Sequence, residues 1–197
     1  MAEEPFFVHT LHKTYLSIAL DSYLKASNLE KKVDRMNFDN LHEFSKILSI
    51  SSQIGECRVI SIIFSALCLE AFINHYAINK FPRPFFDKYL EKLPIKTKWI
   101  LIPRLVTGDS FGMGSKPIAE LKKLFNLRDK LVHFKTCVYD TVEEYVQKEK
   151  KDEIISEQNT KTSLLSVASI IKALRKIDTN VDDDWIKKAL EALALRE

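Results

Sequence analysis

A long apolar stretch at residues 56–80 most constrains how this 197-residue chain can fold. It reads ECRVISIIFSALCLEAFINHYAINK, with apolar side chains around most of a helical circumference. Polar residues such as Ser61, Glu70 and Asn74 interrupt it too often for a membrane span. We therefore expect a central buried helix and no association with a membrane.

The composition favours helices throughout the chain. Only four residues are glycine, and Leu, Ala, Lys, Glu and Ile dominate. We expect an all-α, multi-helix bundle in which the central apolar helix (about 56–80) packs on a second helix (about 117–135). The expected organisation is a single helical domain, 1–197, with a charged excursion at 138–160 and C-terminal helices, 161–197, packed on the bundle.

The cysteines and the N-terminus indicate a cytoplasmic location. Cys57, Cys68 and Cys137 are odd in number and lack CxxC spacing, as expected for reduced thiols. The N-terminus, MAEEPFF, is acidic and unlike the start of a secretory signal. The sequence also predicts neither a metal site nor a cofactor.

The second helix carries an arginine at an unusual position. Its apolar residues follow helical spacing and form one stripe: Leu121, Leu124, Phe125, Leu131 and Val132. Arg128 falls at the centre of this stripe, and His133 falls about 140° away from Arg128 on an ideal helix. An arginine on a core-facing stripe is costly unless it is paired or lies at a subunit contact.

The central helix carries the opposite charge in a similar setting. Glu70 and Asn74 lie among its apolar side chains, so the simplest hypothesis places Glu70 near Arg128. In one interpretation, the two form a buried salt bridge that only fixes helix register. In the other, Glu70 and Asn74 orient Arg128 toward a phosphate.

The string Arg128-Asp-Lys-Leu-Val-His133 resembles the R-x4-6-H motif of the HEPN superfamily, and Glu70-Ala-Phe-Ile-Asn74 resembles the helix that precedes this motif. The resemblance implies a metal-independent endoribonuclease of toxin or defence type. In such enzymes the ribose 2′-hydroxyl attacks the phosphate; Arg128 would grip that phosphate and His133 would act as general acid and base. It also implies a homodimer with facing motifs, an RNA substrate and an antitoxin partner.

Two positions depart from the family pattern. Asp129 stands where an asparagine is usual, and Lys135 where some members have a tyrosine. Many HEPN domains are non-catalytic. The alternative is therefore a non-catalytic dimerisation or binding module with Arg128–Glu70 as a structural pair. A nucleotide-binding accessory protein is a third hypothesis.

The charge distribution bears on an RNA partner. Residues 80–136 contain thirteen basic and five acidic side chains, whereas the whole chain has a net charge of only +3. Such a basic segment suits a polyanion, with Lys122, Lys123, Lys130 and Lys135 as candidate RNA contacts. A solvated lysine surface is the alternative.

Two other features have ordinary explanations. Trp99 lies among lysines and could stack on a base, but its helical spacing favours a core position. His9 and His12 lack a third ligand at useful spacing, so we expect surface histidines rather than a metal site.

Overall fold

The computed structural model describes residues 9–36, 41–134 and 154–194, together with residues 138, 140, 141 and 143. Every regular element within these residues is a helix. The predicted all-α bundle is therefore confirmed. None of the described helices is long and apolar enough to cross a membrane.

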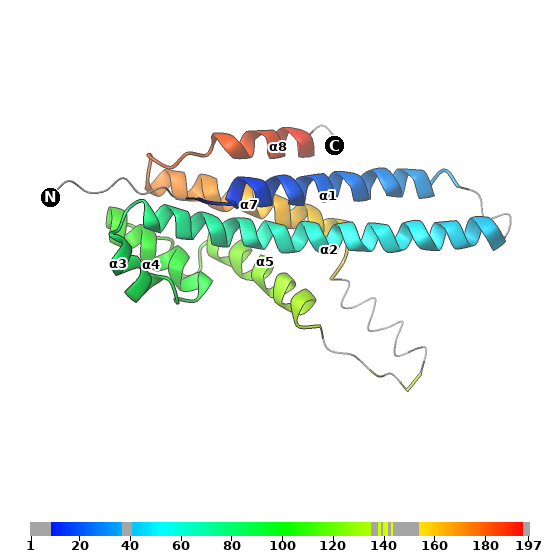
Figure 1. Ribbon diagram of the computed structural model, residues 1–197, viewed down its shortest axis with the longest axis horizontal. Coiled ribbons are helices and arrows are strands. Elements are labelled where there is room, and N and C mark those ends of the chain that lie inside the picture. Colours follow the sequence, from blue (N-terminus) through cyan, green and yellow to red (C-terminus); the bar gives the residue numbers. More distant parts are fainter. Residues whose placement is uncertain are drawn as a thin grey trace.

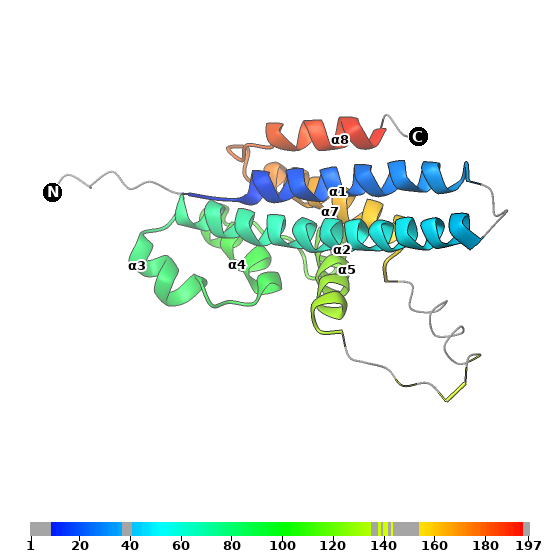
Figure 2. The same cartoon turned by 45° about the vertical axis from the view of Figure 1, so that its right-hand side comes forward.

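Two long antiparallel helices, α1 (His12–Val33) and α2 (Leu41–Ile78), lie side by side and form the spine of the molecule (Figures 1 and 2). The central helix was predicted to begin near residue 56, but α2 begins at Leu41. Gly55 disfavours a helix by about 1 kcal/mol relative to alanine. Packing against α1 outweighs this preference, because Ile50 and Ile54 are buried in a small cluster with Ala26.

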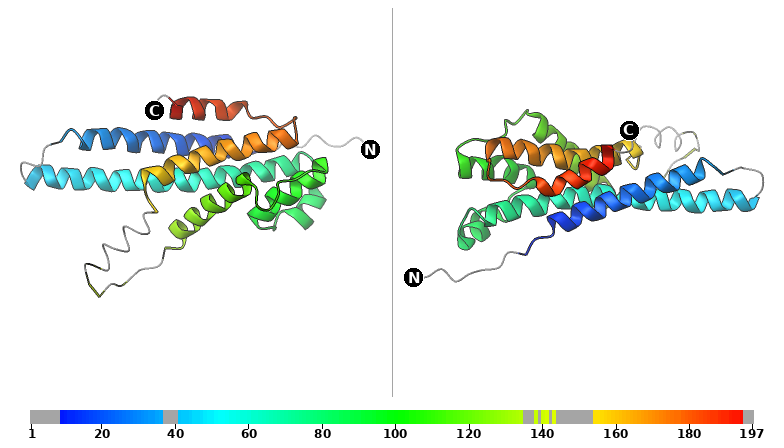
Figure 3. Two further views of the ribbon diagram at one scale, coloured as in Figure 1. Left: turned by 180° about the vertical axis from the view of Figure 1, so that it is seen from behind. Right: turned by 90° about the horizontal axis from the view of Figure 1, so that it is seen from above.

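Within the described residues, seven shorter elements follow α2: α3 (Arg83–Phe85), the π-helical turn η1 (Phe86–Leu90), α4 (Ile95–Thr107), α5 (Lys116–Val132), α7 (Glu157–Ile177), the 3-10 turn η2 (Asp184–Ile186) and α8 (Lys187–Ala194). Helix α7 lies along the α1–α2 pair, and α8 covers α1 and α7 (Figure 3). Helices α4 and α5 pack against α2 and α7. The C-terminal end of α5 points away from the spine (Figures 1 and 2).

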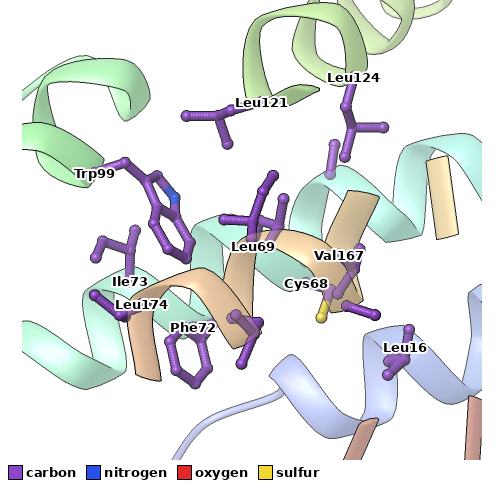
Figure 4. Close-up of a cluster of buried hydrophobic side chains, with 14 of the residues drawn as sticks. Leu16, Cys68, Leu69, Phe72, Ile73, Trp99, Leu121, Leu124, Val167 and Leu174 are labelled. Carbon is purple, nitrogen blue, oxygen red and sulfur yellow. The ribbon is translucent and has the colours of Figure 1, made fainter. Parts of the chain in front are cut away.

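The main core lies where α2, α4, α5 and α7 meet. Figure 4 shows Leu69 and Ile73 of α2 close to Trp99, Leu121 and Val167, which come from three other helices. All five side chains are at most 1% exposed. This packing fixes the N-terminal half of α5. The motif residues lie in the C-terminal half of the same helix and just after it.

The outer parts of the predicted organisation are only partly described. Most of the predicted charged excursion, 138–160, lies outside the described residues, and α7 already begins at Glu157. Within 161–197, Leu164, Ile171 and Ile186 are buried in the main core.

Candidate functional site

Helix α5 begins where its sequence favours a helix start. Ser115 has an extended backbone at the N-cap, and Pro117 occupies the first turn, where a missing N–H costs nothing. Ile118, Leu121 and Leu124 are then buried at helical spacing. The predicted stripe is correct up to this point, and it anchors α5 against α2 and α7.

The stripe does not continue to the end of the helix. Leu131 is half-buried against the core, but Val132 is 51% exposed, contrary to the prediction. Helix α5 ends at Val132, and His133 has non-helical backbone angles. The predicted helix to residue 135 was therefore too long, and the predicted angle between Arg128 and His133 does not apply. The final residues of α5 extend past the described helices that cover its beginning, so these helices do not bury them (Figure 1).

Arg128 lies at the edge of the core rather than at its centre. Its side chain is 25% exposed, and its Nη1 lies 3.2 Å from Asp129 Oδ1. The guanidinium carbon lies 5.2 Å from the centroid of the Phe125 ring. Its Nε is buried, with no hydrogen-bond partner among the described residues. The guanidinium is thus held on an aromatic face, with an adjacent carboxylate as its ion-pair partner.

His133 lies one turn further along, at the exposed end of α5. Its backbone N–H donates to the carbonyl of Asp129 at 2.9 Å, which closes the helix. The imidazole is exposed, and so is the neighbouring Phe134, at 70%. The structure thus brings Arg128, Asp129 and His133 to the same end of one helix.

The structure does not form the expected Glu70–Arg128 pair. Among the described residues, no ion pair joins them, and Arg128 instead pairs with Asp129. The positive charge near Glu70 is Lys98 of α4, which is 4% exposed and donates from Nζ to Asn74 Oδ1 at 2.8 Å. The direct Glu70–Arg128 pair is therefore absent from the described contacts, whereas the role of Glu70 and Asn74 in orienting Arg128 stays a prediction.

Lys98 is an unusual residue for the buried interior of a helical bundle. Burial lowers the pKa of its ammonium group, whereas Glu70 and Glu91 act in the opposite direction. A buried lysine is tolerated only with such partners. Lys98 and Asn74 therefore form a hydrogen-bonded contact between α4 and α2, and Glu70 is close enough to act on Lys98 electrostatically.

Three of the candidate RNA-binding lysines lie on α5. Lys122, Lys123 and Lys130 are exposed and line a shallow groove of about 370 Å³ together with Asn126 and Leu127. Lys135 lies outside the described residues. Three of the four predicted lysines thus share the surface of the helix that carries Arg128.

Two sequence-based expectations about other residues have clear outcomes. Trp99 is fully buried, so its core interpretation is confirmed. His12 is 3% exposed and lies 5.2 Å from His75, ring centroid to centroid, so its prediction as a surface histidine was wrong. No group of side chains suited to a metal ion occurs among the described residues.

In comparisons with known proteins, no family model, no curated protein and no solved structure matches this chain. The chemistry of the site must therefore be judged from its own residues.

Proposed function

We propose that this protein is a HEPN-like, metal-independent endoribonuclease of toxin or defence type that acts as a homodimer. The observation that carries the proposal is that Arg128 and the exposed His133 lie at the same, free end of α5. The same helix also carries Lys122, Lys123 and Lys130, which add positive charge to its surface. Together they offer an RNA strand a guanidinium group that can bind a phosphate, an imidazole and a row of lysines along the helix.

The proposed reaction needs only these groups. A base removes the proton of the ribose 2′-hydroxyl, whose oxygen bonds to the adjacent phosphorus while the bond to the 5′-oxygen breaks. An acid gives a proton to the departing 5′-oxygen, and a 2′,3′-cyclic phosphate remains. An imidazole suits both proton transfers because it ordinarily titrates near neutral pH. Arg128 would stabilise the negative charge on the phosphate oxygens.

A second subunit would complete this site. The reaction requires a base and an acid on opposite sides of the phosphate, and each chain carries one His133. Val132 and Phe134 flank this histidine with exposed apolar surface, which suits a contact between two copies. In a symmetric dimer, one His133 would take the proton and the other would supply one.

The test is cleavage of single-stranded RNA in the presence of a metal chelator. We expect His133→Ala to slow cleavage by about 100-fold or more. His42→Ala is the matched control, because His42 is also exposed but lies at the start of α2. Chelation should leave the rate unchanged. The enzyme proposal fails if wild type and His133→Ala cleave equally, or if neither cleaves.

A non-catalytic binding module is the second candidate. The favouring observation is that Asp129 already occupies the guanidinium of Arg128, while Val132 and Phe134 offer apolar contact surface. This candidate predicts RNA or protein binding without cleavage. Equal RNA affinity for wild type and His133→Ala, with no product from either, would favour it.

A further inference from the structure

We propose that a separate pocket, between the start of α1, the C-terminal part of α2 and the segment joining α7 to α8, binds the base and phosphate of a single nucleotide. The pocket has a volume of about 240 Å³. It lies near the ends of helices that are remote from the free end of α5 (Figures 1 and 3). It therefore does not depend on the proposed RNA-cleaving site.

Aromatic rings form the inner wall of this pocket. His12 packs edge-on against Phe72 and Trp185, with centroid distances of 5.4 Å and 4.9 Å. The ring centroids of Phe72 and Trp185 lie 5.8 Å apart. The indole N–H of Trp185 donates to the carbonyl of Asp182 at 2.9 Å, which fixes the ring. Of these three rings only Trp185 is partly exposed, and its face suits a flat, unsaturated ring better than an aliphatic ligand because any nucleobase can stack on it.

His75, which is only partly buried, adds a hydrogen-bonding edge to this wall, with the buried His12 behind it. Burial lowers the pKa of His12 to about 4, and burial also lowers the pKa of His75. Both imidazoles are therefore neutral at pH 7, and each then has one donor and one acceptor nitrogen. His12 Nδ1 lies 2.8 Å from Thr10 Oγ1, and Asn79 Nδ2 lies 3.0 Å from His75 Nε2. Polar edges beside stacked rings suit a heterocyclic base better than a plain hydrocarbon ring.

The rim supplies positive charge for one anionic group. Lys13 and Lys80 line the pocket, and their acidic partners are Asp182 and Asp178. The Lys13–Asp182 pair is weak, with 3.4 Å between the atoms and both side chains more than half exposed. Lys13 can thus turn toward a ligand at little cost. One available ammonium group, with a second nearby, matches a single phosphate rather than a triphosphate.

A cationic ligand would fit this pocket poorly. Aromatic walls also attract cations, but Lys13 and Lys80 would repel one. Asp178 is unsuited to receive a cation, because Tyr76 donates to its Oδ2 at 2.8 Å and Lys80 lies 3.1 Å from the same oxygen. The ligand chemistry that matches both the aromatic wall and the two lysines is a nucleobase carrying one phosphate. It has two sources, a free mononucleotide or the terminal nucleotide of an RNA strand.

Calorimetric titration with AMP, GMP, CMP and UMP tests this inference, with Trp185 fluorescence as a second readout. The other tryptophan, Trp99, is fully buried and is absent from the residues that line the pocket. We expect at least one mononucleotide to bind and to change the emission. Inorganic phosphate alone should bind more weakly, because it cannot stack. Equal affinity for inorganic phosphate, or no binding of any mononucleotide up to about 5 mM, would overturn the proposal.

Two variants locate the binding site. Lys13→Gln should weaken mononucleotide binding by about 3- to 10-fold, and Trp185→Leu by about 10-fold or more. Lys31→Gln is the control for the first, because Lys31 is exposed on the same helix but does not line the pocket. Because Trp185→Leu could disturb folding, Lys13→Gln decides the question. Equal loss in Lys13→Gln and Lys31→Gln would place binding elsewhere and overturn the assignment.

A last comparison distinguishes the two sources. A short RNA with a terminal phosphate is titrated alongside the mononucleotide that binds best. Tighter binding of the RNA, lost in Lys13→Gln, identifies a strand end as the ligand. Weaker binding of the RNA identifies the free mononucleotide. The pocket shares no lining residue with α5, so failure of the RNA-cleavage proposal would not affect this result.

Discussion

The ammonium group of Lys98 donates a 2.8 Å hydrogen bond to the side-chain oxygen of Asn74, and the lysine side chain is almost fully buried. This bond joins α4 to α2 beneath the surface of the bundle. A buried charge that loses its partner destabilises a protein more than the intact pair stabilises it. The contact is therefore expected to matter for stability rather than for RNA chemistry.

A double-mutant cycle tests this expectation. Lys98→Met and Asn74→Ala should each lower the free energy of unfolding, and the double variant should lose less than the sum by about 1.5 to 3 kcal/mol. Urea denaturation measures all four proteins. Lys96→Met is the control, because Lys96 is exposed on the same helix. Strictly additive losses would show that the bond contributes nothing.

Burial of His12 should make the free energy of unfolding decrease at acidic pH. Burial lowers its pKa to about 4, with help from His75 and Lys13 and against the opposing effect of Asp182. The unfolded chain therefore binds this proton at a higher pH than the folded chain does. Stability is complete above the ordinary pKa of 6.5 and falls as the pH drops toward 4. The loss should reach about 3 kcal/mol from His12 alone.

Urea denaturation at several pH values between about 7 and 4.5 measures this slope. His12→Phe should flatten the slope while keeping a ring in the core. His42→Ala, at an exposed position, should leave it unchanged. Asp178 does not account for the same interval. Burial alone would raise its pKa, but hydrogen bonds from the Asn180 backbone, Tyr76 and Lys80 lower it overall, below 3.8. Identical slopes in wild type and His12→Phe would contradict the prediction.

Hydrophobic spacing predicted much of the fold, because it records which side of a helix is buried. Leu121 and Leu124 were placed in the core by their period, and both are 1% exposed. Trp99 was assigned to the core on the same grounds and is fully buried. Spacing was less informative where a helix extends beyond its neighbours. Val132 continues the period but is exposed, because the end of α5 leaves the bundle.

Contacts between remote segments could not be predicted from one sequence. The charge on Glu70 indicated the need for a cation, but nothing in the sequence distinguished Lys98 from Arg128 as its neighbour. His12, His75 and Trp185 meet only because α1, α2 and the segment before α8 converge. The one available signal was that His12 is followed at helical spacing by Tyr15, Leu16 and Ala19, the last two of which are buried.

Asp129 should weaken the grip of Arg128 on a phosphate. Its Oδ1 lies 3.2 Å from Arg128 Nη1 and adds negative charge beside the proposed site. We expect Asp129→Asn to increase affinity for single-stranded RNA by about 3- to 10-fold, because the amide neither competes for the guanidinium nor repels the phosphate. Asp34→Asn, at the exposed end of α1, is the control. Unchanged affinity in filter-binding assays would separate Arg128 from RNA recognition.

The lysines of α5 should set the salt dependence of RNA binding. Each phosphate contact on a single strand contributes a slope of about −0.7 in log affinity against log salt concentration. Replacing Lys122, Lys123 and Lys130 by glutamine should therefore reduce the slope by about 2. A triple variant of the exposed residues Lys31, Lys32 and Lys46 is the charge-matched control. Equal changes in both variants would indicate a general charge effect instead of binding by the row of lysines on α5.

The proposed dimeric site predicts how inactive subunits affect active ones. Equal amounts of wild type and His133→Ala, allowed to exchange subunits, give about one quarter wild-type dimers. If one His133 takes a proton and the other returns one, only those dimers cleave at full rate, and total activity falls to about a quarter of that of the same total amount of wild type. Independent subunits would retain about half of it. Light scattering must show the same dimer for both proteins, and a monomeric wild type would itself exclude the shared site.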